Sequence, residues 1–316
     1  MQVITLPIRN FSDLSVLLPA YNEEQTIGRT IEAFKGCLPG AQFWVCDNNS
    51  SDRTAAVARA HGANVIREMR QGKGYAVTRL FAEADGDYFL LADADMTYDP
   101  AAAPLMYAEC KAHGYDMVTG IRNHTDAQAY RAGHVVGNRC FSWLFSTLFN
   151  SQSRDIFSGY RMFSRRFIKS FPVTSSGFEI ETELSALAAT LRVPTGEMDC
   201  DYHARPVGSV SKLRTYQDGF RILTSLLRLF CQYRPMAFFG VLAAILVIAG
   251  LAVGLPVIYE FLLTGRILHF PSAILASGIM VIAFTSLVAG LLLDGIKRIS
   301  VEQRQLAYLA LQGVRR

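Results

Sequence analysis

The chain has 316 residues, a net charge of +4 and a hydrophobic content of 51%. That length allows one large domain or two ordinary ones, and the hydrophobic content is slightly high for a soluble protein. The charge is modest, and no run of lysine and arginine interleaved with aromatic residues marks a nucleic-acid surface, so we expect no nucleic-acid partner. The six cysteines form no Cys-x-x-Cys pair, which predicts free thiols in a reducing compartment and excludes an obvious disulfide framework or zinc site.

The first part of the chain alternates short apolar runs with polar turns that lead into helices. Residues 14–18 predict a strand that ends in the turn 19–23, and residues 43–46 predict a second strand that ends at Asp47. Nucleotides bind outside the carboxyl ends of the strands in an open α/β sheet, so both turns are candidate nucleotide contacts. An acid at the second turn suits a hydrogen bond to a base or ribose. Helix capping alone would also explain the polar residues of the first turn.

A glycine-lysine-glycine sequence opens the third predicted helix. It occupies residues 72–74, between a predicted strand at 64–67 and a helix over 75–84. Backbone N–H groups, the positive end of the helix dipole and the ammonium of Lys73 would all attract a phosphate there. The spacing matches neither a P-loop nor a GxGxxG fingerprint, so this sequence by itself is weak evidence for nucleotide binding.

Two aspartates follow the fourth predicted strand. Residues 88–92 form an almost wholly apolar run, typical of a strand buried on both faces of a parallel sheet, and Asp93 and Asp95 come directly after it. Residues i and i+2 of an extended segment project to the same side, so both carboxylates can face one point at the sheet edge. Carboxylate oxygens select Mg²⁺ or Mn²⁺, which commonly bridge a protein to a substrate diphosphate. The alternative is that these acids only shape the turn before the next helix, which Asp99 would cap.

Four strand-helix units predict a doubly wound, mostly parallel α/β sheet, and their motifs together resemble a known family. SVLLPAYNEE, VCDNNSSDRT, the Gly-Lys-Gly helix start and LADADMTYDP, in this order and spacing, resemble the family 2 glycosyltransferases with the GT-A fold. The resemblance implies that Asp93 and Asp95 bring a metal to the diphosphate of a sugar donor. The residues that it places around the nucleotide are Pro19, Tyr21, Glu23 and Asp47. The common Asp-Asp-Gly-Ser after the second strand is Asp-Asn-Asn-Ser here, which puts any role for Asn48 in doubt.

The second half of the sequence narrows the resemblance to a subgroup. YRAGHVVGNR at residues 130–139, RDIFSGYR at 154–161, GFEIE at 177–181 and YHARPVGSVSK at 202–212 occur in that order before two apolar segments. The series is similar to the polyprenyl-phosphate glycosyltransferases, the group that contains the dolichol-phosphate mannose synthases and bacterial undecaprenyl-phosphate sugar transferases. The resemblance implies that Arg122, Arg131 and Asn138 bind the acceptor phosphate and that Arg205 binds the donor diphosphate. With Asp95, Arg122 and Arg131 are the expected catalytic residues, although each arginine alone would more often be a surface or packing residue.

The C-terminal third of the chain is predicted to bind and cross a membrane. Residues 1–213 would form the GT-A domain and residues 214–235 an interfacial amphipathic helix, with arginines on one stripe and apolar residues on the other. Transmembrane helices are predicted at about 236–262 and 271–293, because charge-free runs within them can cross a hydrocarbon core of about 30 Å. A C-terminal helix at 295–316 would follow. The alternatives are a buried helix hairpin of a soluble protein and a solvated helix packed on its own domain.

Basic residues predict the orientation of these spans. Lysine and arginine residues precede the first span and follow the second, whereas Arg266 is the only one in the short connecting loop. The positive-inside rule then places the catalytic domain and both termini in the cytosol. The N-terminus has no basic region followed by an apolar run, so we expect no signal peptide.

Together these features predict a multi-pass membrane enzyme that is a metal-dependent hexosyltransferase. It would move a sugar from a UDP- or GDP-linked donor to a polyprenyl phosphate lipid, using Mg²⁺ or Mn²⁺, with inversion at the anomeric carbon as the resemblance implies. One alternative is a glycan-elongating transferase whose sugar-hydroxyl acceptor needs a carboxylate base, for which Glu179, Glu181 and Glu183 are available. Another is a catalytically silent scaffold that binds nucleotide sugar. The sequence leaves a homo-oligomer open.

Overall fold

The computed structural model describes residues 10–124, 145–147, 153–170, 175, 177, 179–203, 224, 227–228, 230–231 and 233–311. The chain divides into two compact units. Met1–Ile222 and Arg304–Arg316 form the first, here called the sheet unit, and Leu223–Gln303 forms the second, here called the hairpin unit.

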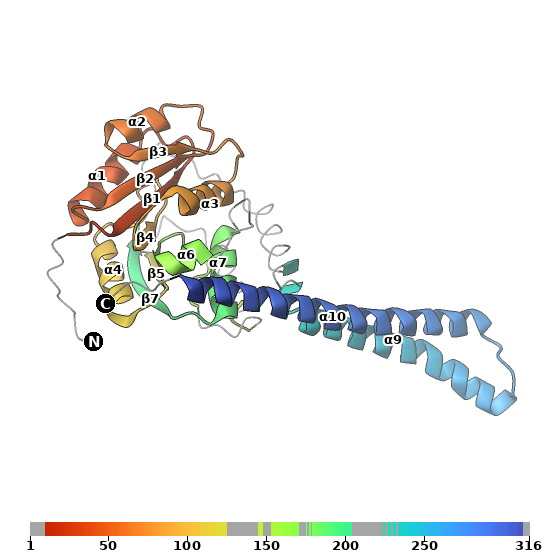
Figure 1. Ribbon diagram of the computed structural model, residues 1–316. Helices are drawn as coiled ribbons and strands as arrows, with labels where there is room; N and C mark the ends of the chain where they lie inside the picture. The colour runs from red at the N-terminus through yellow and green to blue at the C-terminus, as the bar shows by residue number, and fades with distance from the viewer. Residues whose placement is uncertain are drawn as a thin grey trace. The chain divides into compact units, whose positions relative to one another are not determined.

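A single mixed sheet forms the centre of the sheet unit (Figure 1). Within the described residues it has seven strands in the order β3-β2-β1-β4-β6-β5-β7. The strands are β1 (Leu14–Ala20), β2 (Gln42–Asp47), β3 (Asn64–Arg67), β4 (Tyr88–Leu91), β5 (Met117–His124), β6 (Arg161–Ser164) and β7 (Thr195–Tyr202). Strand β6 runs antiparallel to both of its neighbours, β4 and β5, and the other neighbouring pairs are parallel. The predicted mostly parallel α/β sheet is therefore confirmed, whereas the antiparallel insertion of β6 has no counterpart in the sequence analysis.

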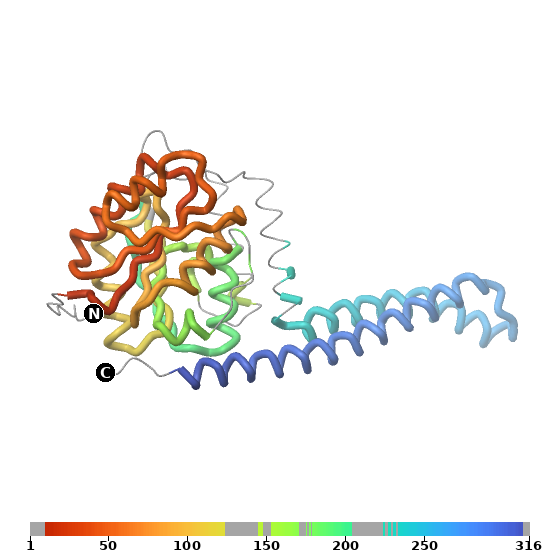
Figure 2. The backbone as a smooth tube through the Cα atoms, turned by 45° about the horizontal axis from the view of Figure 1, so that its top comes forward, coloured from red at the N-terminus to blue at the C-terminus, as the bar shows by residue number. Residues whose placement is uncertain are grey.

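Helices cover both faces of this sheet (Figures 1 and 2). They are α1 (Ile27–Cys37), α2 (Thr54–Ala60), α3 (Lys73–Glu83), α4 (Ala102–His113), α6 (Arg165–Ser170) and α7 (Ile180–Leu191). Alternate residues of a strand point to opposite faces, so each face builds its own core. On one face Leu18 of β1 packs with Phe34 of α1 and Met106 of α4. On the other face Phe81 of α3 meets Phe163 of β6 edge to face, with ring centroids 5.6 Å apart.

Strand β4 lies in the middle of the sheet, and its residues Tyr88–Leu91 are all buried. It pairs with β1 on one side and β6 on the other, which confirms the buried strand predicted from its apolar run. Strand β1 is longer than predicted and continues through Pro19 to Ala20. Its pairing with β4 ends at Leu17, so the proline, which has no N–H to donate, lies where only β2 pairs with the strand. The carboxyl ends of β1, β2 and β4 consequently meet at one edge of the sheet.

The hairpin unit contains two long helices that lie side by side, α9 (Pro235–Thr264) and most of α10 (Phe270–Ala310) (Figure 2). Both are long and apolar enough to cross a membrane, and the most apolar 18-residue windows of α9 and α10 have mean hydropathies of 2.8 and 2.2. Only 17% of the most apolar window of each is buried, which is unlike the core helix of a soluble protein. The C-terminal segment predicted as a separate helix at 295–316 instead continues α10 to Ala310, since no proline interrupts the helical hydrogen bonding there.

Small residues line the contact between α9 and α10. The buried positions recur at heptad spacing and include Ala243, Gly250 and Val257 of α9 and Ala276, Ala283 and Gly290 of α10. A Cβ on Gly290 would lie 2.9 Å from Cβ of Phe239, and one on Gly250 would lie 3.0 Å from Sδ of Met280. The close approach of the two helices therefore depends on the missing side chains, as in helix pairs within membranes.

Candidate functional site

The two aspartates after β4 occupy a turn that is held by hydrogen bonds. Oδ1 of Asp95 accepts from the backbone N–H of Thr97 at 3.2 Å and from its hydroxyl at 2.6 Å, and Asp95 is 3% exposed. The hydroxyl of Thr30 in α1 donates to the carbonyl of Ala94 at 3.2 Å. The side chain of Asp93 is 26% exposed. Asp95 therefore helps to shape the turn, and Asp93 is the more accessible of the two carboxylates.

Lys73, the first residue of α3, lies between two carboxylates. Its Nζ is 2.5 Å from Oδ1 of Asp93 and 2.6 Å from Oε1 of Glu181, and its side chain is 12% exposed. Burial by itself lowers the pKa of Lys73, but the two carboxylates outweigh burial and raise the pKa above its ordinary value. Lys73 is thus a charged, largely buried lysine with two acidic partners. Its contact with a donor phosphate stays a prediction.

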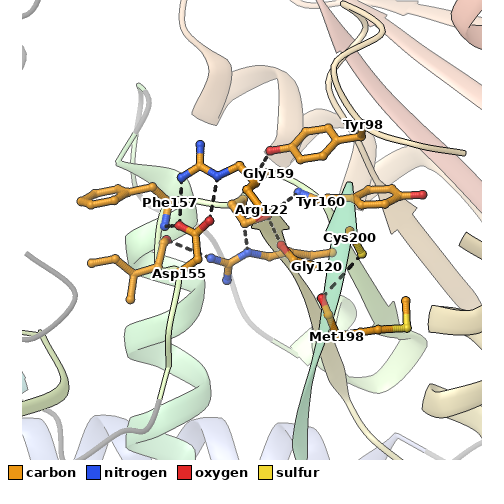
Figure 3. A network of polar contacts seen from close by, with 12 residues as sticks. Tyr98, Gly120, Arg122, Asp155, Phe157, Gly159, Tyr160, Met198 and Cys200 are labelled. Atoms are coloured by element: carbon orange, nitrogen blue, oxygen red, sulfur yellow. Dashed lines mark hydrogen bonds and ion pairs between the residues drawn. The ribbon is translucent and has the colours of Figure 1, made fainter. Parts of the chain in front are cut away.

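The backbone at Gly159 lies close to the cluster formed by Lys73, Asp93 and Glu181. A Cβ on Gly159 would lie 3.1 Å from Nζ of Lys73 and 3.2 Å from Oδ2 of Asp93, so a larger residue would press on the pair. The N–H of Gly159 donates to the hydroxyl of Tyr98 at 2.9 Å (Figure 3). The ring of Tyr98 in turn stacks on Tyr160 with centroids 4.9 Å apart. Gly159 belongs to the RDIFSGYR segment, and no local pattern in that segment marks this glycine as part of the site.

The three glutamates considered as alternative bases each have a partner. Glu181 forms an ion pair with Lys73, and the side chain of Glu181 is 5% exposed. Oε2 of Glu183 accepts the N–H of Ser175 at 2.8 Å, and Oε1 of Glu179 accepts the N–H of Gly177 at 3.2 Å. Glu181 is therefore the one of the three that joins the cluster around Asp93.

Hydrogen bonds join the turn after β1 to the turn after β2. The N–H of Glu23 donates to Oγ1 of Thr54 at 2.8 Å, and the N–H of Asn22 donates to Oγ of Ser50 at 3.0 Å. Oδ1 of Asp47 accepts the N–H of Ser50 at 3.1 Å. The predicted nucleotide-binding residues Pro19, Tyr21, Glu23 and Asp47 all lie at this edge. The structure thus brings them together beside the end of β1 and β2, as expected for side chains at the carboxyl ends of parallel strands.

Asn48 has a structural role that the sequence analysis did not foresee. Its Nδ2 donates to the carbonyls of Glu68 at 3.3 Å and Arg70 at 2.7 Å, and its Oδ1 accepts the N–H of Gly72 at 2.7 Å. These bonds tie the turn after β2 to the start of α3, which carries Lys73. An aspartate could not donate to either carbonyl, which accounts for the asparagine at this position.

Arg122 of β5 forms an ion pair with Asp155 (Figure 3). Its Nε and Nη2 donate to the two carboxylate oxygens at 2.7 and 2.9 Å, and the two side chains are 15% and 5% exposed. The guanidinium also lies 5.6 Å from the centroid of the Tyr202 ring. Asp155 is a residue that the sequence reasoning missed, although it is the acid next to Arg154 in the quoted RDIFSGYR segment.

The buried guanidinium of Arg161 holds the loop that carries Asp155. It donates to the carbonyl of Ser158 at 2.8 Å and to that of Ile156 at 2.9 Å. Arg161 has no exposed surface, and burial lowers its pKa. The position of the ion pair with Arg122 is thus set from inside the core.

Asp93 and Asp95 carry the ligand type that suits a divalent cation. Both supply carboxylate oxygens, the ligand type that Mg²⁺ and Mn²⁺ prefer. In the part of the chain that the structure describes, no group of three or more His, Cys, Asp or Glu side chains is arranged to hold a metal ion. Two carboxylates suit a cation that takes its other ligands from water and substrate phosphates.

Three predicted site residues, Arg131, Asn138 and Arg205, lie outside the described residues. Most of the predicted amphipathic helix at 214–235 does too. Their roles in acceptor binding, donor binding and membrane contact therefore stay predictions.

Comparison with known proteins gives consistent matches. Residues 15–171 match the family model described as Glycosyl transferase family 2. The chain is 32% identical over 291 residues to Glycosyltransferase AglJ of Haloferax volcanii, and the match covers 91% of this chain and 95% of the relative. It is 29% identical over 224 residues to the Dolichyl-phosphate hexose transferase of the same organism, and this match covers 71% of this chain and 96% of the relative.

A solved structure shares the fold of the sheet unit. Glucosyl-3-phosphoglycerate synthase from Mycobacterium tuberculosis, in complex with Mn²⁺, uridine diphosphate and glucosyl-3-phosphoglycerate, superposes with a TM-score of 0.56. The two chains are 23% identical, and the match covers 68% of this chain and 79% of that chain. At this identity the likeness shows the fold alone, and it confirms the predicted GT-A fold.

Proposed function

This chain belongs to glycosyltransferase family 2, and from that premise we propose that it transfers a sugar from a nucleoside-diphosphate donor to a polyprenyl phosphate at a membrane surface. One observation carries the finer proposal. A single chain combines a carboxylate pair at the edge of a GT-A sheet with two helices that are long and apolar enough to cross a membrane. A relative named as a dolichyl-phosphate hexose transferase supports a lipid phosphate as the acceptor.

The donor would bind at the edge where β1, β2 and β4 end. The residues proposed to contact it are Pro19, Tyr21, Glu23, Asp47, Lys73, Asp93 and Arg205. Asp93 and Asp95 would also hold Mg²⁺ or Mn²⁺, which neutralises charge on the departing nucleoside diphosphate. The mycobacterial structure with Mn²⁺ and uridine diphosphate on the same fold supports this assignment.

A phosphate acceptor has to be held close to the donor, and it does not have to be deprotonated by the enzyme. The second pKa of a phosphate monoester is about 6, so most of the acceptor carries a nucleophilic oxygen at neutral pH. Arginine binds phosphate through paired hydrogen bonds, and we assign that role to Arg122 and Arg131, with Asn138 as a further contact. The ion pair with Asp155, at 2.7 and 2.9 Å, fixes the plane of the Arg122 guanidinium.

The second candidate function, transfer to a sugar hydroxyl, would need a carboxylate base. Such a base typically contributes about 10² to 10⁴ in rate. Glu181 is the glutamate nearest to the cluster, and it is bonded to Lys73 at 2.6 Å. Its carboxylate is 5% exposed and already engaged by that ammonium, so it is not placed to accept a proton from an acceptor hydroxyl. This contact favours the phosphate acceptor. A silent scaffold is disfavoured because Asp93 and Asp95 are both present.

The proposed topology places the catalytic site and the C-terminus on one side of the membrane. Arg304–Arg316 belongs to the same compact unit as Met1–Ile222, and the hydroxyl of Tyr308 donates to Oδ2 of Asp116 at 2.5 Å. Two crossings return a chain to the side on which it started, which agrees with this contact. The distribution of lysine and arginine then makes that side the cytosol.

A lipid-extraction assay tests the proposal. Membranes that contain the protein are incubated with polyprenyl phosphate, Mn²⁺ and a panel of radiolabelled UDP-hexoses and GDP-mannose, and the lipid is extracted into organic solvent. We expect label in the lipid phase for one donor, and none with Asp95→Asn as the matched control. Label that enters a water-soluble glycan instead would support the hydroxyl acceptor, and no transfer from any donor would reject the proposal.

A further inference from the structure

Lys73 bonds one of the two carboxylates that a metal would need. We propose that Lys73 is a positioning residue that couples metal binding to donor binding: its ammonium holds Asp93 in the donor-free protein, so a divalent cation binds weakly until a nucleoside diphosphate accompanies it. The inference rests on the proposed function, because it takes a nucleoside diphosphate as part of the donor.

The geometry fixes Lys73 in this position. Its Nζ lies 2.5 Å from Oδ1 of Asp93, and the N-terminus of its helix is held by the bond from the N–H of Gly72 to Asn48 at 2.7 Å. The backbone at Gly159 closes the opposite side, since a Cβ there would lie 3.1 Å from Nζ. A side chain that is 12% exposed and enclosed in this way cannot leave the cluster freely.

The local charges explain why a metal alone would bind weakly. Asp93 and Asp95 supply two negative charges, and the described residues provide no group of three or more metal-binding side chains. The ammonium of Lys73 neutralises part of that charge, and it places a like charge close to any cation that binds Asp93. A diphosphate brings negative charge that offsets both the metal and the ammonium. Metal and nucleoside diphosphate should therefore strengthen each other's binding.

Glu181 makes the exchange feasible. It lies 2.6 Å from Nζ of Lys73 and is 5% exposed, so it can keep the ammonium paired when a metal takes Asp93. Lys73 and Glu181 should therefore have opposite effects on metal binding. Removing the charge of Lys73 should tighten metal binding in the absence of nucleotide, whereas removing the charge of Glu181 should weaken it. A merely structural role would weaken metal binding in both variants.

The test measures Mn²⁺ directly. Electron paramagnetic resonance follows the loss of the free Mn²⁺ signal as detergent-solubilised full-length protein is titrated, with and without UDP or GDP, after correction for Mn²⁺ bound by the nucleotide alone. In the wild type we expect a nucleoside diphosphate to lower the Kd for Mn²⁺ by about tenfold, within the range of ordinary coupling between sites. In Lys73→Met the nucleotide-free Kd should fall by about fivefold or more and the effect of nucleotide should shrink.

Three further variants keep the result interpretable. Lys73→Arg retains the charge and should retain the coupling, and Glu181→Gln should raise the nucleotide-free Kd. Lys111→Met is the matched control. Lys111 lies on α4, and like Lys73 it pairs with an aspartate, its Nζ lying 3.4 Å from Oδ2 of Asp13. A Kd for Lys73→Met that is unchanged or higher, with UDP or GDP still bound, overturns the inference alone. If Lys73→Met does not fold, a Kd for Glu181→Gln equal to or below that of the wild type overturns it. Calorimetry that detects neither nucleotide on the wild type with Mn²⁺ overturns the proposed function as well.

Discussion

Replacing Asn48 with aspartate tests how the edge of the site is assembled. Asn48 is 4% exposed, donates to two backbone carbonyls at 3.3 and 2.7 Å and accepts the N–H of Gly72 at 2.7 Å. Aspartate keeps the shape and the acceptor but loses both donors, and its charge would face the two carbonyl oxygens. The carboxylate of Glu68 lies in the same segment, and a side-chain hydrogen bond from Arg70 lowers its pKa to about 2, so it is ionised too. The substitution therefore adds a second negative charge to a buried region.

The expected loss of stability is substantial. A buried polar group that is left unsatisfied costs about 1–3 kcal/mol, so the loss of two donated hydrogen bonds predicts a destabilisation of about 2–6 kcal/mol. For a unit of this size each 1 kcal/mol corresponds to about 2–4 °C in Tm. We therefore expect Asn48→Asp to lower the apparent Tm by about 4–24 °C.

The loss should shrink in acid. Burial and the facing carbonyls raise the folded-state pKa of the introduced carboxyl above the value of about 3.9 in the unfolded chain. A group whose folded pKa is raised stabilises the fold below its unfolded pKa and loses that contribution as the pH rises through the folded pKa. The difference in Tm between the variant and the wild type should thus be larger at pH 7 than at pH 4.

Differential scanning fluorimetry of the detergent-solubilised full-length protein measures this effect. Asn49→Asp is the matched control, because Asn49 is half-buried, and its φ of 62° is one that aspartate tolerates. If Asn48→Asp melts within about 2 °C of this control at pH 7, the contacts of Asn48 do not stabilise the fold and the reasoning is refuted.

Further substitutions test the site and the hairpin. Asp95→Asn should remove metal-dependent transfer in the extraction assay without changing the apparent Tm, and near-normal wild-type turnover in EDTA would contradict a metal requirement. Arg131→Ala should raise the apparent KM for polyprenyl phosphate and lower kcat severely, whereas Glu181→Gln at saturating Mn²⁺ should keep a substantial fraction of activity. Steady-state kinetics that show the reverse pattern would favour the hydroxyl acceptor. Gly290→Val should lower the apparent Tm, because a Cβ there would lie 2.9 Å from a side chain of α9, and Gly278→Val, where nothing lies within 4 Å, controls for helix propensity. Equal melting of the two glycine variants would rule out close packing at Gly290.

Local patterns in the sequence were enough to predict the main elements and the position of the acids. Residues 88–92 are apolar because β4 is buried between β1 and β6, and Asp93 and Asp95 then reach the sheet edge through chain order alone. The two helices that are long and apolar enough to cross a membrane likewise follow from uninterrupted apolar composition. Each of these features depends on residues that are close together in the chain, so periodicity and composition are sufficient to find them.

The tertiary structure alone decided what the side chains contact. The sequence around Lys73 predicts a phosphate ligand, yet the ammonium lies between Asp93, beyond the end of β4, and Glu181 of α7. The same holds for Arg122, whose pairing with Asp155 depends on the loop before β6 and on the antiparallel insertion of that strand. The partner of a buried charge depends on where distant elements cross. The free energy of burying a charge is determined by that partner. No local pattern therefore specifies whether the charge is held by the protein or left for a ligand.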